Sequence, residues 1–229
     1  STHKTYPGGS HTLTQEYSNN AGATNNTYHT GRPTKSRSSN TLNGNTFSSE
    51  ERYSYNNNLV TGTKIKGNGT SWLTTAFTYD ANGNITQKTI NADGVASRSE
   101  QFEYTGYGQR FLTKSIGTEG LETTFAYDAN TGNLQTITNP YNLVTNFEYD
   151  KWDRLKKQTD YLGKETLHTY LPQTGGGLKK TTDYATGAKA ETLYNAFGWA
   201  IKSGALSLDN QWVYKDFEYD VLGRKTRES

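Results

Sequence analysis

The chain has 229 residues, 24 of them basic and 22 acidic, so its formal net charge is only +2. The charges are spread along the chain, which disfavours a protein that binds nucleic acid or anionic membranes. The absence of cysteine excludes disulfides and thiolate metal sites. Hydrophobic residues make up 31%, whereas 17 residues are tyrosine and 23 are glycine. An enzyme built from helices around an aliphatic core is therefore not expected.

The first 49 residues are rich in serine, threonine and asparagine. Tyr6 is followed by Gly8, and Tyr28 is followed by Gly31. These are degenerate copies of a tyrosine–glycine pattern that is regular from residue 50 onward. We interpret residues 1–49 as degenerate repeats or a cap. Because the chain contains no methionine, we expect it to be a segment of a longer protein.

From residue 50 onward a tyrosine recurs eight times, usually two residues after a phenylalanine. The spacing is 21 to 25 residues, and such a fixed period is the signature of a repeat protein. The tyrosines that anchor the repeats are Tyr55, Tyr79, Tyr104, Tyr127, Tyr149, Tyr170, Tyr194 and Tyr219. Residues 50–229 are thus predicted to hold eight repeats, continuous with residues 1–49 in one repeat domain.

Each repeat is predicted to form a β-hairpin. Phe147 and Tyr149 would share one face of a strand, and Glu148 between them would point to the other face. An aspartate or asparagine and then a glycine usually follow the tyrosine, and glycine accepts the positive φ of a tight turn. The turn residues predicted to anchor the repeats are Asp80, Asp128, Asp150, Asp220, Gly83, Gly108, Gly132, Gly198 and Gly223. A second strand then begins at an apolar residue such as Phe111.

Turn residues recur about every 8–12 residues, and no stretch has helical periodicity. A single hairpin is marginally stable in water, so repeats of this kind bury their aromatic side chains by stacking on neighbours. The sequence therefore predicts an all-β fold of antiparallel hairpins stacked into a curved or spiralling sheet. That sheet would be an open strip or part of a shell.

The repeats resemble the YD-repeat, or Rhs-repeat, family, whose signature is Tyr-Asp, two residues, Gly, Arg and Leu. Residues 149–155 and 219–224 come closest, although Asp153 stands where glycine is usual. In this family a spiralling β-sheet closes into a hollow shell, as in bacterial polymorphic and insecticidal toxins and in the teneurin barrel. The resemblance implies a secreted or cell-surface protein of bacterial origin. The chain has no Asp-Pro pair, so we do not expect the autoproteolysis found in some members.

The aspartates that follow the tyrosines have two interpretations. They are candidates for catalytic acids or metal ligands, or else they cap turns by accepting backbone hydrogen bonds. Asn56 and Asn195 replace aspartate in two repeats, and asparagine caps a turn but cannot act as a base. We therefore predict a structural role, with no catalytic residue, metal or cofactor. Four tryptophans are alternative candidates for stacking on a ligand: Trp72, Trp152, Trp199 and Trp212.

Two functions stay open. The first is a non-enzymatic structural module, part of a β-shell that encapsulates or presents a toxin or other cargo, whose partner is the rest of its parent chain or a C-terminal cargo. The second is an extracellular adhesion or carbohydrate-binding module that uses exposed Tyr and Trp on a cell-surface glycan or protein. Neither involves nucleic acid, and no apolar run approaches the ~18 residues of a membrane span. Exposed strand edges would permit self-association.

Overall fold

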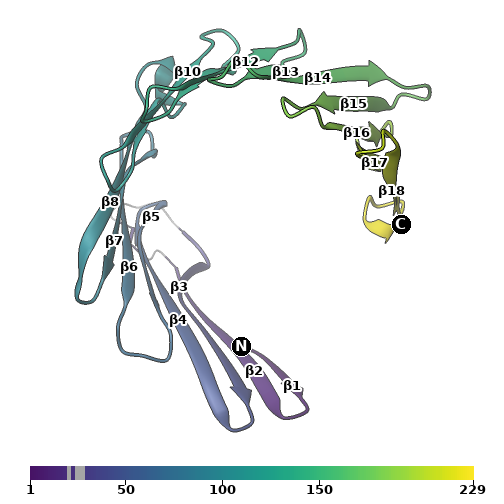
Figure 1. The fold of residues 1–229 in the computed structure, drawn as a ribbon. Coiled ribbons are helices and arrows are strands. Elements are labelled where there is room, and N and C mark those ends of the chain that lie inside the picture. The colour runs from purple at the N-terminus through teal and green to yellow at the C-terminus, as the bar shows by residue number, and fades with distance from the viewer. Residues whose placement is uncertain (20–21, 24–28) are drawn as a thin grey trace. The chain divides into compact units, whose positions relative to one another are not determined.

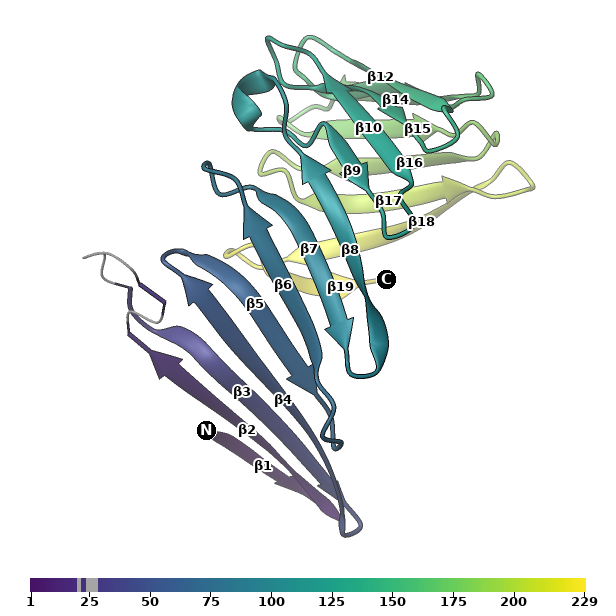
Figure 2. The ribbon, with the colours of Figure 1, turned by 90° about the vertical axis from the view of Figure 1, so that its left-hand side faces the viewer.

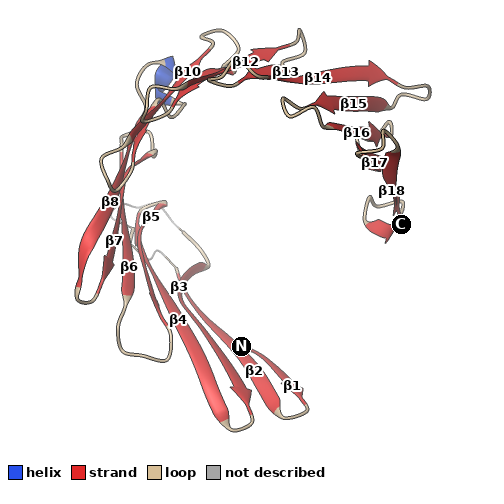
Figure 3. Ribbon diagram, viewed as in Figure 1, coloured by secondary structure: helices blue, strands red, loops and turns tan. Residues whose placement is uncertain are grey.

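The structure is a computed structural model that describes residues 1–19, 22–23 and 29–229, so Tyr28 lies outside the described residues. Contacts divide the chain into two compact units, Ser1–Glu122 (unit 1) and Thr123–Ser229 (unit 2). Nearly every element in the described residues is a β-strand (Figure 3). The all-β prediction is therefore confirmed.

Unit 1 is an antiparallel sheet in which each strand pairs with the next strand along the chain (Figure 1). Its longest strands, in residues 9–56, are rich in threonine and serine, which suit a pleated surface that is open to water. The strands are β1 (Thr2–Tyr6), β2 (Gly9–Ser18), β3 (Arg32–Leu42), β4 (Asn45–Asn56), β5 (Leu59–Lys66), β6 (Leu73–Tyr79), β7 (Ile85–Ala92), β8 (Val95–Glu103) and β9 (Lys114–Ile116).

Unit 2 repeats the same antiparallel order with shorter strands (Figure 2). The strands are β10 (Glu122–Tyr127), β11 (Leu134–Thr138), β12 (Val144–Tyr149), β13 (Leu155–Thr159), β14 (Glu165–Pro172), β15 (Leu178–Asp183), β16 (Lys189–Tyr194), β17 (Ala200–Leu206), β18 (Trp212–Tyr219) and β19 (Lys225–Glu228). Consecutive pairing of this kind is what a series of hairpins requires.

The two faces of the sheet differ in composition. In β12, Phe147 and Tyr149 are half-buried, whereas Asn146 and Glu148 are exposed. We call the side that carries the anchor tyrosines the tyrosine face and the other side the charged face. No hydrophobic side chain among the described residues is fully buried, so the sheet has no conventional core. Backbone ladders and half-buried aromatic rings therefore stabilise the fold.

One local prediction is wrong. The second strand of the Tyr104 repeat does not begin at Phe111, because β9 begins at Lys114. Gly106 and Gly108 have φ angles of 68° and 65°, and they bend the chain into a single 3₁₀ turn, η1 (Tyr107–Gln109). Tyr104 itself follows the last residue of β8 rather than lying within the strand.

Candidate functional site

All eight anchor tyrosines are half-buried. Five of them end a strand, and the others are Tyr55 near the end of β4, Tyr170 within β14 and Tyr104 beyond β8. Beside Tyr149 the register shifts, since Glu148 pairs with Lys157 but Tyr149 pairs with Leu155. The second strand of this hairpin thus carries one extra residue, a β-bulge that increases the local twist. The same shift occurs beside Tyr55, Tyr79, Tyr127, Tyr194 and Tyr219.

Tyrosine hydroxyls link successive repeats. The hydroxyl of Tyr170 donates a 3.0 Å hydrogen bond to the carbonyl oxygen of Leu155, the residue that pairs with Tyr149 in the preceding hairpin. Each such bond fixes one hairpin to the previous one and contributes about 1 kcal/mol. The corresponding bonds run from Tyr55 to Pro33 (2.7 Å), from Tyr79 to Val60 (2.5 Å) and from Tyr219 to Ala200 (2.9 Å).

Tyr17 also belongs to this series, although the regular spacing of the repeats did not indicate it. Tyr17 in β2 lies beside the same type of register shift and pairs with Pro33, whose carbonyl accepts the hydroxyl of Tyr55. Tyr17 therefore occupies the anchor position of the preceding hairpin, whereas Tyr6 pairs with Gly9 next to the first turn. Tyr17 lies 38 residues before Tyr55, outside the regular period, but the dipeptide Glu-Tyr that it shares with later repeats was a signal.

The aspartates after the tyrosines bond to their own turns. Oδ1 of Asp150 accepts hydrogen bonds from the backbone N–H groups of Trp152 (2.9 Å) and Arg154 (3.1 Å), and Oδ2 accepts one from Nε of Arg154 (2.8 Å). The Arg154 bond, together with the backbone bonds and the arginine charge, holds the pKa of Asp150 below its usual range. Equivalent backbone bonds reach the side chains of Asp80, Asp128, Asn195 and Asp220.

The turn glycines lie at positions of positive φ. The values are 87° for Gly83, 65° for Gly108, 79° for Gly132, 80° for Gly198 and 79° for Gly223. Asp153, which replaces glycine in its turn, adopts φ of 58°. This conformation is costly for most side chains but is tolerated by aspartate and asparagine.

The four tryptophans differ in exposure. Trp152 is 69% exposed at a turn, whereas Trp72, Trp199 and Trp212 are half-buried. The ring of Trp199 packs against Tyr219, with 5.4 Å between ring centroids. Trp212 is stacked on Tyr214 with centroids 5.9 Å apart. Only Trp152 thus offers most of its surface to a ligand.

A buried ionic group that the sequence did not indicate lies on the charged face of unit 2. Glu191 in β16 is only 6% exposed; it forms an ion pair with Lys179 and accepts a 2.6 Å hydrogen bond from the hydroxyl of Tyr214. Tyr214 reaches Glu191 across Gly204. Only glycine leaves room for this contact, because a Cβ atom at position 204 would lie 2.5 Å from the tyrosine ring. Burial raises the pKa of Glu191, but the bonds from Lys179 and Tyr214 outweigh burial and lower it.

The acidic and histidine side chains are dispersed over the described part of the chain. No group of three or more His, Asp or Glu side chains there could hold a metal ion. Glu148, paired with Asp150 in sequence, instead forms an ion pair with Lys157 at 2.5 Å. No helix among the described residues has the length and apolarity needed to cross a membrane.

These features define a structural module of YD-type hairpins. The family model described as the teneurin YD-shell matches residues 9–227, and the chain therefore belongs to this family. The match includes most of residues 1–49, where the Tyr-Asp repeat motif is degenerate. A search of curated proteins finds no match.

Solved structures of TcdB2-TccC3 have a similar fold. The crystal structure of TcdB2-TccC3 has a TM-score of 0.55 and 11% identity, and the match covers 83% of this chain and 12% of that chain. The form of TcdB2-TccC3 without its hypervariable C-terminal region gives a TM-score of 0.54 and 11% identity, over 86% of this chain and 12% of that chain. The recognised resemblance to YD-repeat shells is confirmed.

Proposed function

We propose that this module forms part of the wall of a non-enzymatic shell that encloses or presents a cargo outside the cell or at its surface. The observation that carries the proposal is the hydroxyl–carbonyl bond between successive hairpins, because at Tyr55, Tyr79, Tyr170 and Tyr219 it fixes one hairpin to the hairpin before it. The anchor tyrosines, turn aspartates and turn glycines serve this structural role. The TcdB2-TccC3 complex, with its hypervariable C-terminal region, supports a cargo attached to the same parent chain.

Electron cryomicroscopy of the natural full-length gene product tests this proposal. We expect a hollow particle in which these hairpins form part of the wall and density for another segment lies inside. A solvent-open strip with nothing enclosed would contradict the shell role. Turnover of a glycan or peptide by this chain would contradict the non-enzymatic assignment.

A second candidate, adhesion through exposed aromatic side chains, is favoured by the exposure of turn residues in unit 2. Trp152 is 69% exposed and Phe197 is 77% exposed, and both follow an anchor tyrosine by three residues. Binding on a glycan array that is lost in Trp152→Ala would support adhesion. Binding that is unchanged in this variant would exclude Trp152 as the contact.

A further inference from the structure

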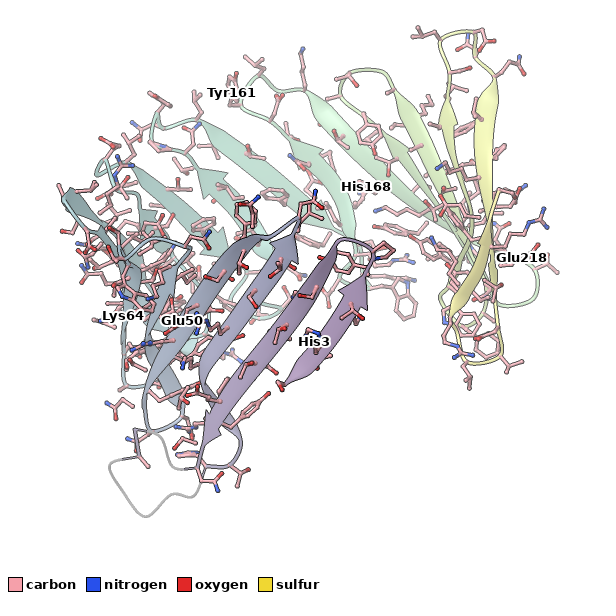
Figure 4. The ribbon with its side chains drawn as sticks, turned by 90° about the horizontal axis from the view of Figure 1, so that it is seen from below. His3, Glu50, Lys64, Tyr161, His168 and Glu218 are labelled. Carbon is pink, nitrogen blue, oxygen red and sulfur yellow. The ribbon has the colours of Figure 1, made fainter. Side chains whose placement is uncertain are left out.

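The charged face of unit 1 concentrates basic side chains that are far apart in sequence. Lys35, Arg52 and Lys64 lie directly opposite one another on β3, β4 and β5. In the next row, Arg37 and Lys66 flank Glu50. Figure 4 labels Glu50 and Lys64 in this part of the unit. We call Lys35, Arg37, Arg52, Lys64 and Lys66 the basic patch.

The arrangement of the patch is unfavourable for the folded sheet alone. Neighbouring strands are ~4.8 Å apart, and side chains two residues apart on a strand are separated by ~6.8 Å. Like charges placed directly opposite one another on a sheet are destabilising. A row of three basic residues therefore has a cost that an external anion would relieve.

Few carboxylates neutralise the patch. Glu50, which is 9% exposed, accepts a 2.7 Å hydrogen bond from Nε of Arg52, and Glu16 on β2 forms a 2.7 Å ion pair with Lys35. Within the described residues no carboxylate forms an ion pair with the other three members, Arg37, Lys64 and Lys66.

Trp72, just before β6, orders two of the cations. The guanidinium of Arg52 lies 5.0 Å from the centroid of the Trp72 ring, and Nζ of Lys66 lies 4.8 Å from it. Cations held over an aromatic face lose less freedom when they bind an anion, which favours affinity. The patch is thus partly preorganised.

We propose that the basic patch binds a linear sulfated polysaccharide. Sulfate groups along such a chain would neutralise the two rows of cations. The hydroxyl of Ser39 flanks the patch on the same face as a donor for the sugar, whereas the hydroxyl of Ser48 beside it donates to Oδ1 of Asn68. This inference concerns a ligand of the sheet surface and goes beyond the shell role. It holds or fails independently of whether a shell closes.

Two other polyanions fit the observations less well. Single-stranded nucleic acid is held by basic grooves with aromatic residues free to stack on bases, whereas the Trp72 ring already carries two cations. Anionic membranes favour surfaces that also insert apolar side chains. Next to the patch, the Trp72 ring carries two cations, and further neighbours on this face are Ser39, Ser48, Gly62 and Thr74.

Calorimetric titration of the 229-residue chain with a heparin oligosaccharide tests the proposal, with uncharged dextran, single-stranded DNA and phosphatidylserine vesicles as comparison probes. We expect heparin to bind and its affinity to fall between 50 and 200 mM salt, because binding releases counterions. Arg37→Gln with Lys64→Gln should weaken binding by about tenfold or more. Glu50→Gln should tighten binding several-fold, because it removes the carboxylate inside the patch.

Lys151→Gln with Lys156→Gln is the matched control, since it removes the same charge from the densest basic cluster in the sequence, in unit 2. Heparin affinity should stay within twofold of the unmodified chain in this control. Circular dichroism of every variant confirms that the strands are retained. Equal losses in patch and control variants, no binding of heparin, or tighter binding of DNA or vesicles than of heparin would each overturn the proposal.

Discussion

The charged face of strands β3 to β5 in unit 1 differs from the charged face of unit 2 in how its charges are matched. In unit 2, Lys157 lies between Glu148 and Glu165, with N–O distances of 2.5 and 3.2 Å. Further pairs on this face are Lys179–Glu191, Lys189–Asp183, Lys202–Asp216 and Arg227–Glu218. In unit 1, the strands β3 to β5 instead place basic residues opposite basic residues.

This contrast indicates that the tyrosine face and the charged face of a repeat are constrained in different ways. The tyrosine face is constrained in both units, because its hydroxyls bond to the backbone of the preceding hairpin. On the charged face the contacts between successive hairpins run from side chain to side chain, such as Lys157 with Glu165 and Tyr214 with Glu191, so they depend on which residues stand at those positions. We infer that unit 2 uses its charged face for stability and that unit 1 uses part of its charged face for binding.

The largest expected effect comes from removing an anchor in unit 2. Tyr170→Ala deletes a half-buried ring, its contact with the Arg154 guanidinium at 4.3 Å and the hydroxyl bond to Leu155. We expect the free energy of unfolding to fall by about 2–3 kcal/mol. Urea denaturation followed by tryptophan fluorescence measures it.

Tyr17→Ala in unit 1 is the comparison for this anchor. Tyr17 is 57% exposed, and its hydroxyl bonds to Gln15 rather than to a preceding hairpin. Its removal should cost less than about 1 kcal/mol. Equal losses in the two variants would show that the inter-repeat bond has no special importance.

The next effect tests the matched charges of unit 2. Lys179→Met retains the aliphatic stem but leaves the buried carboxylate of Glu191 without its cation, with only the Tyr214 hydroxyl as partner. We expect a loss of about 1–3 kcal/mol in the free energy of unfolding. The double variant Lys179→Met with Glu191→Gln should recover part of this loss. If it recovers none, the loss in Lys179→Met comes from the packing of the lysine side chain and not from the unpaired carboxylate.

A smaller effect concerns the loss of folding stability at low pH. The pKa of Asp150 is lowered in the folded chain, chiefly by the hydrogen bond from Arg154. The ionised carboxylate therefore stabilises the fold above the pKa of the unfolded chain, about 4, and this stability is lost as pH falls through the folded-state value. Asp150→Asn should flatten the dependence of stability on pH below about 5. Glu119→Gln, at an exposed turn, should leave the curve unchanged.

The sequence predicted the repeat because its signals are local. A tyrosine, an aspartate and a glycine within eight residues specify the strand end and the turn, so the hairpins of unit 2 could be predicted directly. The bend at Gly106 and Gly108 was missed because the period continued through Tyr104 while the local backbone did not. Residues that meet only through strand register left no local signal.

The basic patch and Glu191 illustrate that limit. Lys35 and Lys64 are 29 residues apart, and only the pairing of β3 with β4 and of β4 with β5 places them in one row. The densest basic run in the sequence, at residues 151–157, instead has two of its members paired with carboxylates, Arg154 with Asp150 and Lys157 with Glu148. Charge density along a chain thus did not predict charge density on a surface.

The smallest expected effect has the opposite sign to the others. Lys64→Thr removes one cation from the row of Lys35 and Arg52 and introduces a residue that favours strands. Relief of like-charge repulsion should raise the free energy of unfolding of unit 1 by about 0.2–0.5 kcal/mol at low salt. The gain should disappear at 1 M salt, where the Debye length is ~3 Å. Trp72, the one tryptophan in the sequence of unit 1, reports the transition. A destabilised Lys64→Thr chain at low salt would mean that the cations of unit 1 support the fold as those of unit 2 do.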